Sequence, residues 1–120
     1  KEKIIIAEIK HKFQENEFSP PAWEEIEAVK GLNEADLNEI ISYLIDNGFL
    51  FKISDSIYFS VAAIEKGKEL LTEYFSREKE LSLATARDIF NTSRKYALPL
   101  LEYYDRIRFT RRVGDMRIKA

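Results

Sequence analysis

Residues 92–118 read "TSRKYALPLLEYYDRIRFTRRVGDMRI" and contain a helix start, an apolar helix and two short basic segments. Thr92 or Ser93 is a good N-cap, because its hydroxyl can accept a hydrogen bond from a free N–H group of the first turn. Gly114 and Asp115 separate the two basic segments in the way that turn residues separate the strands of a β-hairpin. The stretch therefore predicts a helix over 92–107 followed by a two-stranded wing over 108–120.

Positive charge lies at the unfavourable end of this helix. Arg94 and Lys95 occupy the predicted first turn, whereas the helix dipole favours cations at the C-terminus. A helix start that combines free N–H groups, a hydroxyl, a guanidinium and an ammonium suits phosphate groups or base edges. Pro99 removes the hydrogen bond to the Lys95 carbonyl, so we expect either a later helix start or a slight bend.

With this stretch included, the chain contains the same predicted order of elements twice. Before the stretch, helices are predicted over 61–78 and 81–90. The first half gives helices over 2–13, from Ser19 to Gly31 and over 33–48 with Asn33 as cap, then two strands within 49–60. Overlaying the halves places Asp46 opposite Asp105 at an offset of 59 and Asp55 opposite Asp115 at an offset of 60. We therefore expect a mainly α fold with small β wings: two tandem winged helix-turn-helix domains, 1–62 and 63–120.

Charge divides unevenly between the halves. Residues 1–60 carry 6 Lys and Arg against 12 Asp and Glu, and residues 61–120 carry 13 against 9. Only the second half is suited to a polyanion, so the first domain is expected to be a spacer or docking platform. The second wing has five basic residues, and strand alternation sends Arg111 and Arg112 to opposite faces, so not all can meet one partner.

The sequence offers little for catalysis. The 120 residues include no cysteine and one histidine, His11, on a polar helix face, and no G-x-x-x-x-G-K-[ST] phosphate loop. We therefore expect no enzyme activity, metal or cofactor. No apolar run is long enough to span a bilayer, and we expect a cytoplasmic, monomeric fragment, since the chain opens inside a helical pattern without a cap.

The "SRKYALPLLEY-D" helix and the "TRRVGD-R" wing together resemble the last winged-helix domain of the bacterial selenocysteine-specific elongation factor (SelB) family. The resemblance is strong over about residues 80–119. It implies a module that grips a messenger RNA hairpin beside a UGA codon, while a GTPase core outside this chain brings selenocysteyl-tRNA to the ribosome. The implied RNA contacts are Ser93, Arg94, Lys95 and Tyr96 at the helix start, Arg111, Arg112, Asp115 and Arg117 on the wing, and, more weakly, Arg87. The family wing usually has another basic residue where this chain has Met116.

Two other functions fit the predicted fold. A winged-helix transcription regulator would place its third helix in the DNA major groove, but here basic residues stop at Lys95 and resume only at Arg106. A protein-interaction scaffold would use the acidic first half and would expose an apolar patch. An RNA hairpin suits the observed pattern better, because a helix start and a wing can clasp a loop and its flanking phosphates.

Overall fold

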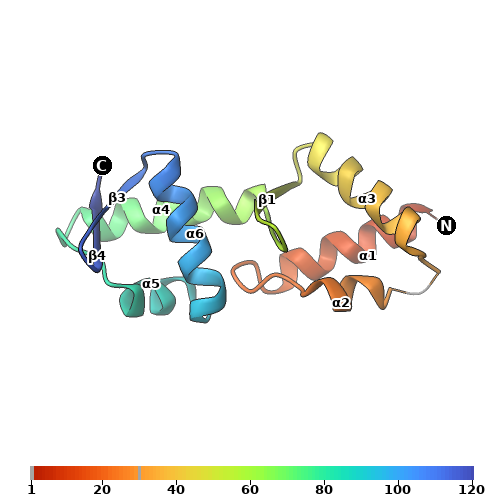
Figure 1. Ribbon diagram of the computed structural model, residues 1–120, viewed down its shortest axis with the longest axis horizontal. Coiled ribbons are helices and arrows are strands. Elements are labelled where there is room, and N and C mark those ends of the chain that lie inside the picture. The colour runs from red at the N-terminus through yellow and green to blue at the C-terminus, as the bar shows by residue number, and fades with distance from the viewer. Residues whose placement is uncertain (1, 30) are drawn as a thin grey trace. The chain divides into compact units, whose positions relative to one another are not determined.

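The computed structural model describes residues 2–29 and 31–120. The chain divides into two compact units, Lys1–Val61 and Ala62–Ala120. Both have three helices followed by an antiparallel two-stranded hairpin (Figure 1). The mainly α composition with small β hairpins is therefore confirmed.

The first unit packs its helices around one apolar core. Its elements are α1 (Glu2–Glu15), α2 (Trp23–Glu27), α3 (Glu34–Asp46), β1 (Leu50–Ser54) and β2 (Ile57–Ser60). Ile9, Phe13, Leu37 and Leu44 are fully buried in this core, with Leu50 from the hairpin. The helical spacing of these residues explains their burial, because positions three and four apart lie on one face.

The second helix begins later than the sequence predicted. It starts at Trp23 rather than at Ser19, and the Ala22 N–H donates to the Glu25 carboxylate at 2.9 Å. Two prolines follow Ser19, and a residue before proline is disfavoured in helical conformation, so the helix forms only after Pro21. The Asn33 cap of α3 is confirmed, since its side-chain oxygen accepts from the Asp36 N–H at 2.8 Å.

The second unit repeats the order of elements. Its members are α4 (Val61–Phe75, whose first residue belongs to the first unit), α5 (Leu83–Phe90), α6 (Arg94–Arg106), β3 (Thr110–Val113) and β4 (Met116–Lys119). The apolar side of α6 faces the core: Ala97, Leu100, Leu101 and Tyr104 are buried, and Leu98 is half-buried. Tyr104 donates its hydroxyl to the Ile64 carbonyl at 2.7 Å, which ties α6 to α4, and burial raises the pKa of the phenol.

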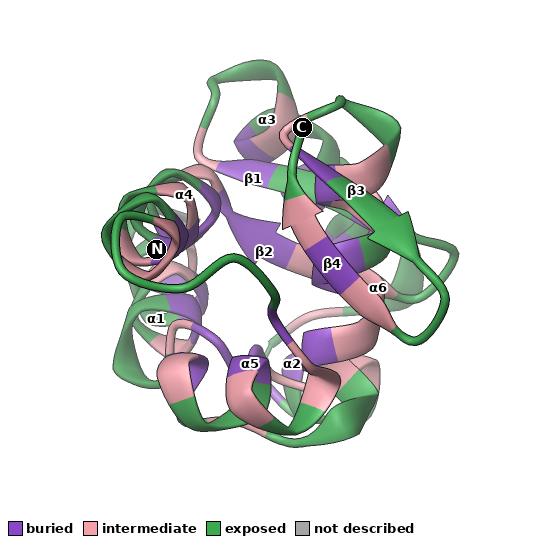
Figure 2. Ribbon diagram, turned by 90° about the vertical axis from the view of Figure 1, so that its left-hand side faces the viewer, coloured by how far each residue is buried: buried purple, intermediate pink, exposed green. Residues whose placement is uncertain are grey.

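The wing of the second unit consists of β3, β4 and the turn between them. Strand β4 makes backbone hydrogen bonds along both of its edges. Along one edge β4 pairs with β3, and along the other Arg117 and Leu81 exchange two backbone hydrogen bonds of 2.8 Å each. The middle of β4 is buried, while the outer part of β3 is exposed (Figure 2). Leu81, predicted as the first residue of the helix over 81–90, instead pairs with β4 and clamps the wing to the helices, and α5 begins at Leu83.

The third helix of each unit ends with the same backbone hydrogen bond. Phe49 donates its backbone N–H to Leu44, and Phe109 donates to Tyr104, both at 2.9 Å. The numbers of equivalent positions therefore differ by 60 at both ends of this bond. Asp46 is equivalent to Arg106, and the expected offset of 59 between Asp46 and Asp105 is wrong at this helix end.

A left-handed residue follows each of these helix ends. In the first unit it is Gly48 at φ +76°, whereas in the second it is Arg108 at φ +62°. A side chain in this conformation brings Cβ too close to the following carbonyl, at a cost of roughly 1–2 kcal/mol that glycine avoids. The second unit therefore keeps an arginine where its own backbone favours glycine.

Candidate nucleic-acid interface

The start of α6 presents its polar groups to solvent. Ser93 is the N-cap residue, with extended backbone, and Ser93, Arg94 and Lys95 are all exposed. The Ser93 side chain makes no capping hydrogen bond, so the prediction that its hydroxyl accepts from a backbone N–H is wrong, although the cap position is correct. The hydroxyl and the N–H groups of Arg94 and Lys95 are thus available for a ligand, whereas the Tyr96 N–H donates to the Ser93 carbonyl at 3.1 Å.

Tyr96 adds a ring to this helix start. The ring is half-buried, and the Lys95 ammonium lies 5.4 Å from its centroid. A cation above an aromatic face in this way is attracted by the ring quadrupole. The pair gives a flat apolar surface and a positive charge side by side, as base stacking beside a phosphate requires.

Arg87 lies near the C-terminal end of α5, just before the turn that leads into α6. The Thr92 N–H donates to the Arg87 carbonyl at 3.0 Å, and Asn91 closes α5 in the left-handed conformation at φ +51°. This tight turn places the exposed Arg87 next to the start of α6. Helix α6 begins at Arg94 and includes Pro99, so the Lys95 carbonyl lacks its usual partner in the next turn.

The wing cations divide between its two faces. Arg112 pairs directly across from Arg117, and Arg111 pairs across from Ile118, so the two neighbouring arginines point to opposite sides as predicted. Arg112 is exposed and donates from Nε to the Gly114 carbonyl at 2.9 Å. Asp115 is exposed in the turn that follows.

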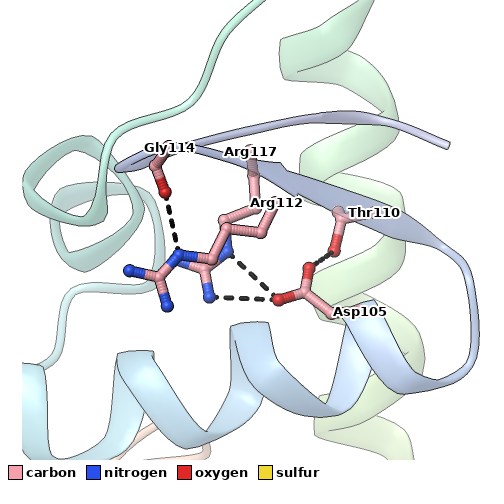
Figure 3. Close-up of polar contacts among 5 residues, drawn as sticks. All are labelled: Asp105, Thr110, Arg112, Gly114 and Arg117. Carbon is pink, nitrogen blue, oxygen red and sulfur yellow. Dashed lines mark hydrogen bonds and ion pairs between the residues drawn. The ribbon is translucent and has the colours of Figure 1, made fainter.

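Arg117 lies inside the unit, unlike the other wing cations. It is 2% exposed, and its guanidinium donates to Asp105 Oδ2 from Nη2 at 3.0 Å and from Nε at 3.3 Å (Figure 3). The other carboxylate oxygen accepts from the Thr110 hydroxyl at 2.6 Å. Asp105 thereby joins the end of α6 to both strands of the wing, and Arg117 is placed to hold the wing rather than to meet a ligand.

A basic hollow lies where the end of α6 meets the base of the wing. It has a volume of about 680 Å³, and its charged lining residues are Asp105, Arg106, Arg108, Arg111, Arg112 and Lys119. Arg106, Arg108 and Lys119 were not among the predicted site residues. The sequence signal that could have found them is the density of cations after Asp105.

The predicted site residues form two groups. Ser93, Arg94, Lys95, Tyr96 and Arg87 gather at the start of α6, whereas Arg111 and Arg112 line the basic hollow beyond its other end. Along the axis of α6, Arg106 at the edge of the hollow lies about 18 Å from Arg94, at 1.5 Å per residue. A ligand that contacts both Arg94 and Arg106 must be extended.

The described residues hold no group of three or more metal-ligating side chains. Nor does any helix in the described part of the chain have the length and apolarity needed to cross a membrane.

Three helices followed by a paired hairpin, with Leu81 bridged to the wing, make the second unit a winged helix. Residues 73–118 match the family described as "Elongation factor SelB, winged helix". The selenocysteine-specific elongation factor of Desulfomicrobium baculatum is 30% identical over 98 residues, which cover 82% of this chain and 16% of that protein. The chain belongs to the SelB elongation factor family, and it spans about a sixth of the length of this curated relative.

Two solved structures show the same fold. One is the mRNA-binding domain of elongation factor SelB from E. coli in complex with SECIS RNA, with a TM-score of 0.74, 23% identity and coverage of 96% of both chains. The other is a bacterial selenocysteine-specific elongation factor, EF-Sec, with a TM-score of 0.72 and 22% identity, covering 97% of this chain and 18% of that one.

Proposed function

We propose that this chain is the module of a selenocysteine-specific elongation factor that binds a hairpin in messenger RNA. The observation that carries the proposal is the start of α6, where an uncapped helix end, Arg94, Lys95 and the Tyr96 ring are presented together. Family membership supports it, and so does the fold shared with a domain that was solved with SECIS RNA. The chain acts by binding, and the GTPase of the parent protein lies in other domains.

In this proposal the helix start meets the unpaired loop of the hairpin. Arg94 donates to a base edge or a phosphate, and Tyr96 stacks on a splayed base. Ser93 and Lys95 contact the neighbouring phosphates, with Arg87 in support. A loop is the suitable target, because the major groove of an A-form stem is too deep and narrow for a helix to read.

The wing contributes further contacts from its exposed side chains. Arg111 and Arg112 approach the phosphate backbone, while Asp115, which only accepts hydrogen bonds, suits a base amino group or a ribose hydroxyl. Arg117 has a different part: with Asp105 and Thr110 it fixes the angle at which the wing leaves α6. A pre-positioned wing lowers the entropy lost on binding.

We propose that the first unit is a second winged helix, so that residues 1–62 and 63–120 are tandem domains. The repeated element order, the shared numbering offset and the matching helix ends support a duplication. The start of α3 carries Glu34 and Asp36 where α6 has Arg94 and Tyr96, so it repels phosphate, and the first domain is a spacer or platform. Contacts with the ribosome and selenocysteyl-tRNA are made by the whole protein.

The test is a salt-dependent titration of the chain with an RNA hairpin from a bacterial selenoprotein message. A scrambled-loop hairpin and a DNA duplex are the comparison ligands. The native hairpin is expected to bind more tightly by several kcal/mol, with affinity falling as salt rises. Arg94→Ala is expected to cost about 1–3 kcal/mol against the native loop and much less against the scrambled one.

Lys52→Gln, in the wing of the first unit, removes one positive charge and serves as the matched control, with unchanged affinity. Equal, weak binding of all three nucleic acids would leave the scaffold alternative in place. Preference for the duplex would support the transcription-regulator alternative instead.

A further inference from the structure

We propose that the basic hollow at the base of the wing is a second RNA contact, which holds the phosphate backbone of the hairpin stem. It rests on the proposed function and extends it from the loop to the stem. The residues that carry it are Arg106, Arg108 and Lys119, joined by Arg111 and Arg112.

The charges of the hollow are unbalanced. Its one acidic lining residue, Asp105, already binds Thr110 through one oxygen and the buried Arg117 through the other. Within the described residues, Arg108, Arg111 and Lys119 have no ion-pair partner. The cations that line this concave surface concentrate a positive field that favours an anionic ligand.

The backbone at Arg108 is an independent indication. This residue adopts φ +62° at an exposed position, where the first unit has Gly48 with the same hydrogen bonding. Strain kept at a surface position, where glycine would remove it, indicates that the side chain has a use. The dipole at the end of α6 explains Arg106, but it explains neither the arginine at 108 nor Lys119.

The fold itself does not require this charge. At an offset of 60, the first unit has Asp46, Gly48, Phe51 and Lys52 where the second has Arg106, Arg108, Arg111 and Arg112. The equivalent positions therefore carry one cation and one carboxylate, and the excess of positive charge is particular to the second unit.

Distance selects the part of the RNA that reaches the hollow. The loop-contacting groups at the start of α6 lie about 18 Å from Arg106 along the helix axis. A nucleotide bound there cannot also fill the hollow, whereas the stem that continues from the loop can extend along the helix. Phosphates carry no sequence information, so this contact adds affinity without adding selectivity.

The test uses the full chain with two hairpins that share the native loop, one with a short stem and one with a long stem, and a long-stem hairpin with a scrambled loop. Arg108→Gly and Lys119→Gln are each expected to weaken binding of both long-stem hairpins by about 3- to 10-fold. Each should also reduce the slope of log affinity against log salt by about 1. The short-stem hairpin should bind all variants equally, and Lys52→Gln should match the wild type.

Arg108→Gly also separates binding from folding, because it relieves the left-handed strain and should raise the midpoint of thermal unfolding while RNA affinity falls. Wild-type affinity and salt slope in both hollow variants would overturn the proposal. If the native loop is still preferred and Arg94→Ala still reduces that preference, only the stem contact fails. If no loop is preferred but the hollow variants still lose long-stem affinity, the stem contact stands and the proposed function fails. Absence of hairpin binding would overturn both.

Discussion

Asp105 is the residue on which the position of the wing depends. Its side chain is 23% exposed, and it binds the guanidinium of Arg117, whose side chain is 3% exposed. The guanidinium also faces Arg112, its directly opposite cross-strand neighbour, so two like charges meet on one face of the hairpin. The carboxylate offsets this repulsion, and without it the buried cation would have no counter-charge.

Asp105→Asn should therefore lower the free energy of unfolding by about 3 kcal/mol, since an unpaired buried charge is costly. Arg117→Met should cost less, about 1–2 kcal/mol, because Asp105 would still accept from Thr110 and reach water. Urea unfolding of the wild type and of these two variants measures the three free energies of unfolding. Asp55→Asn, at the exposed turn of the first hairpin, is the control and should stay within about 0.5 kcal/mol of the wild type. Equal stability of Asp105→Asn and the wild type would show that the network does not fix the wing.

At the scale of elements, the third helices of the two units, α3 and α6, differ in how the N-cap residue is used. Asn33 caps α3 through its side chain, whereas Ser93, its equivalent in the second unit, leaves its hydroxyl unused in capping. A capping residue normally stabilises its helix by about 1 kcal/mol. The start of α6 lacks that bond, and its polar groups are exposed.

The pair makes a matched test. Asn33→Ala should lower stability by about 1 kcal/mol and leave RNA affinity unchanged, because it removes a real cap from the unit that does not bind. Ser93→Ala should change stability by less than about 0.5 kcal/mol but weaken binding of the native hairpin. Thermal unfolding of both variants measures their stability, and titration with the native hairpin measures their RNA affinity. A loss of stability in Ser93→Ala without loss of affinity would mean that the hydroxyl is only a cap.

Most elements could be predicted from sequence because their signals are local. The apolar spacing of α6, the Asn33 cap and the Gly114–Asp115 turn each lie within one short stretch of chain. The start of α2 was missed because the effect of two successive prolines outweighed the capping signal of Ser19. The role of Arg117 was also out of reach, since its burial depends on Leu81, which precedes α5, and on Asp105, which lies near the end of α6.

For the whole molecule, the central claim is a division of labour between the two units. Residues 1–60 carry a net charge of −6 and residues 61–120 a net charge of +4, by the counts of 6 against 12 and 13 against 9. A polyanion is therefore repelled by one unit and attracted by the other. The likeness to the SelB mRNA-binding domain extends over both units, so fold alone does not distinguish them.

Amide chemical-shift mapping of the full chain during titration with the native hairpin tests this claim most directly. We expect shifts over residues 87–96, at the start of α6, and over 106–119, around the wing and the basic hollow. Residues 2–29 and 31–61 should be unaffected, including the acidic start of α3. Shifts concentrated at Asn33–Asp36, or spread evenly over both units, would contradict the division and the account of RNA recognition built on it.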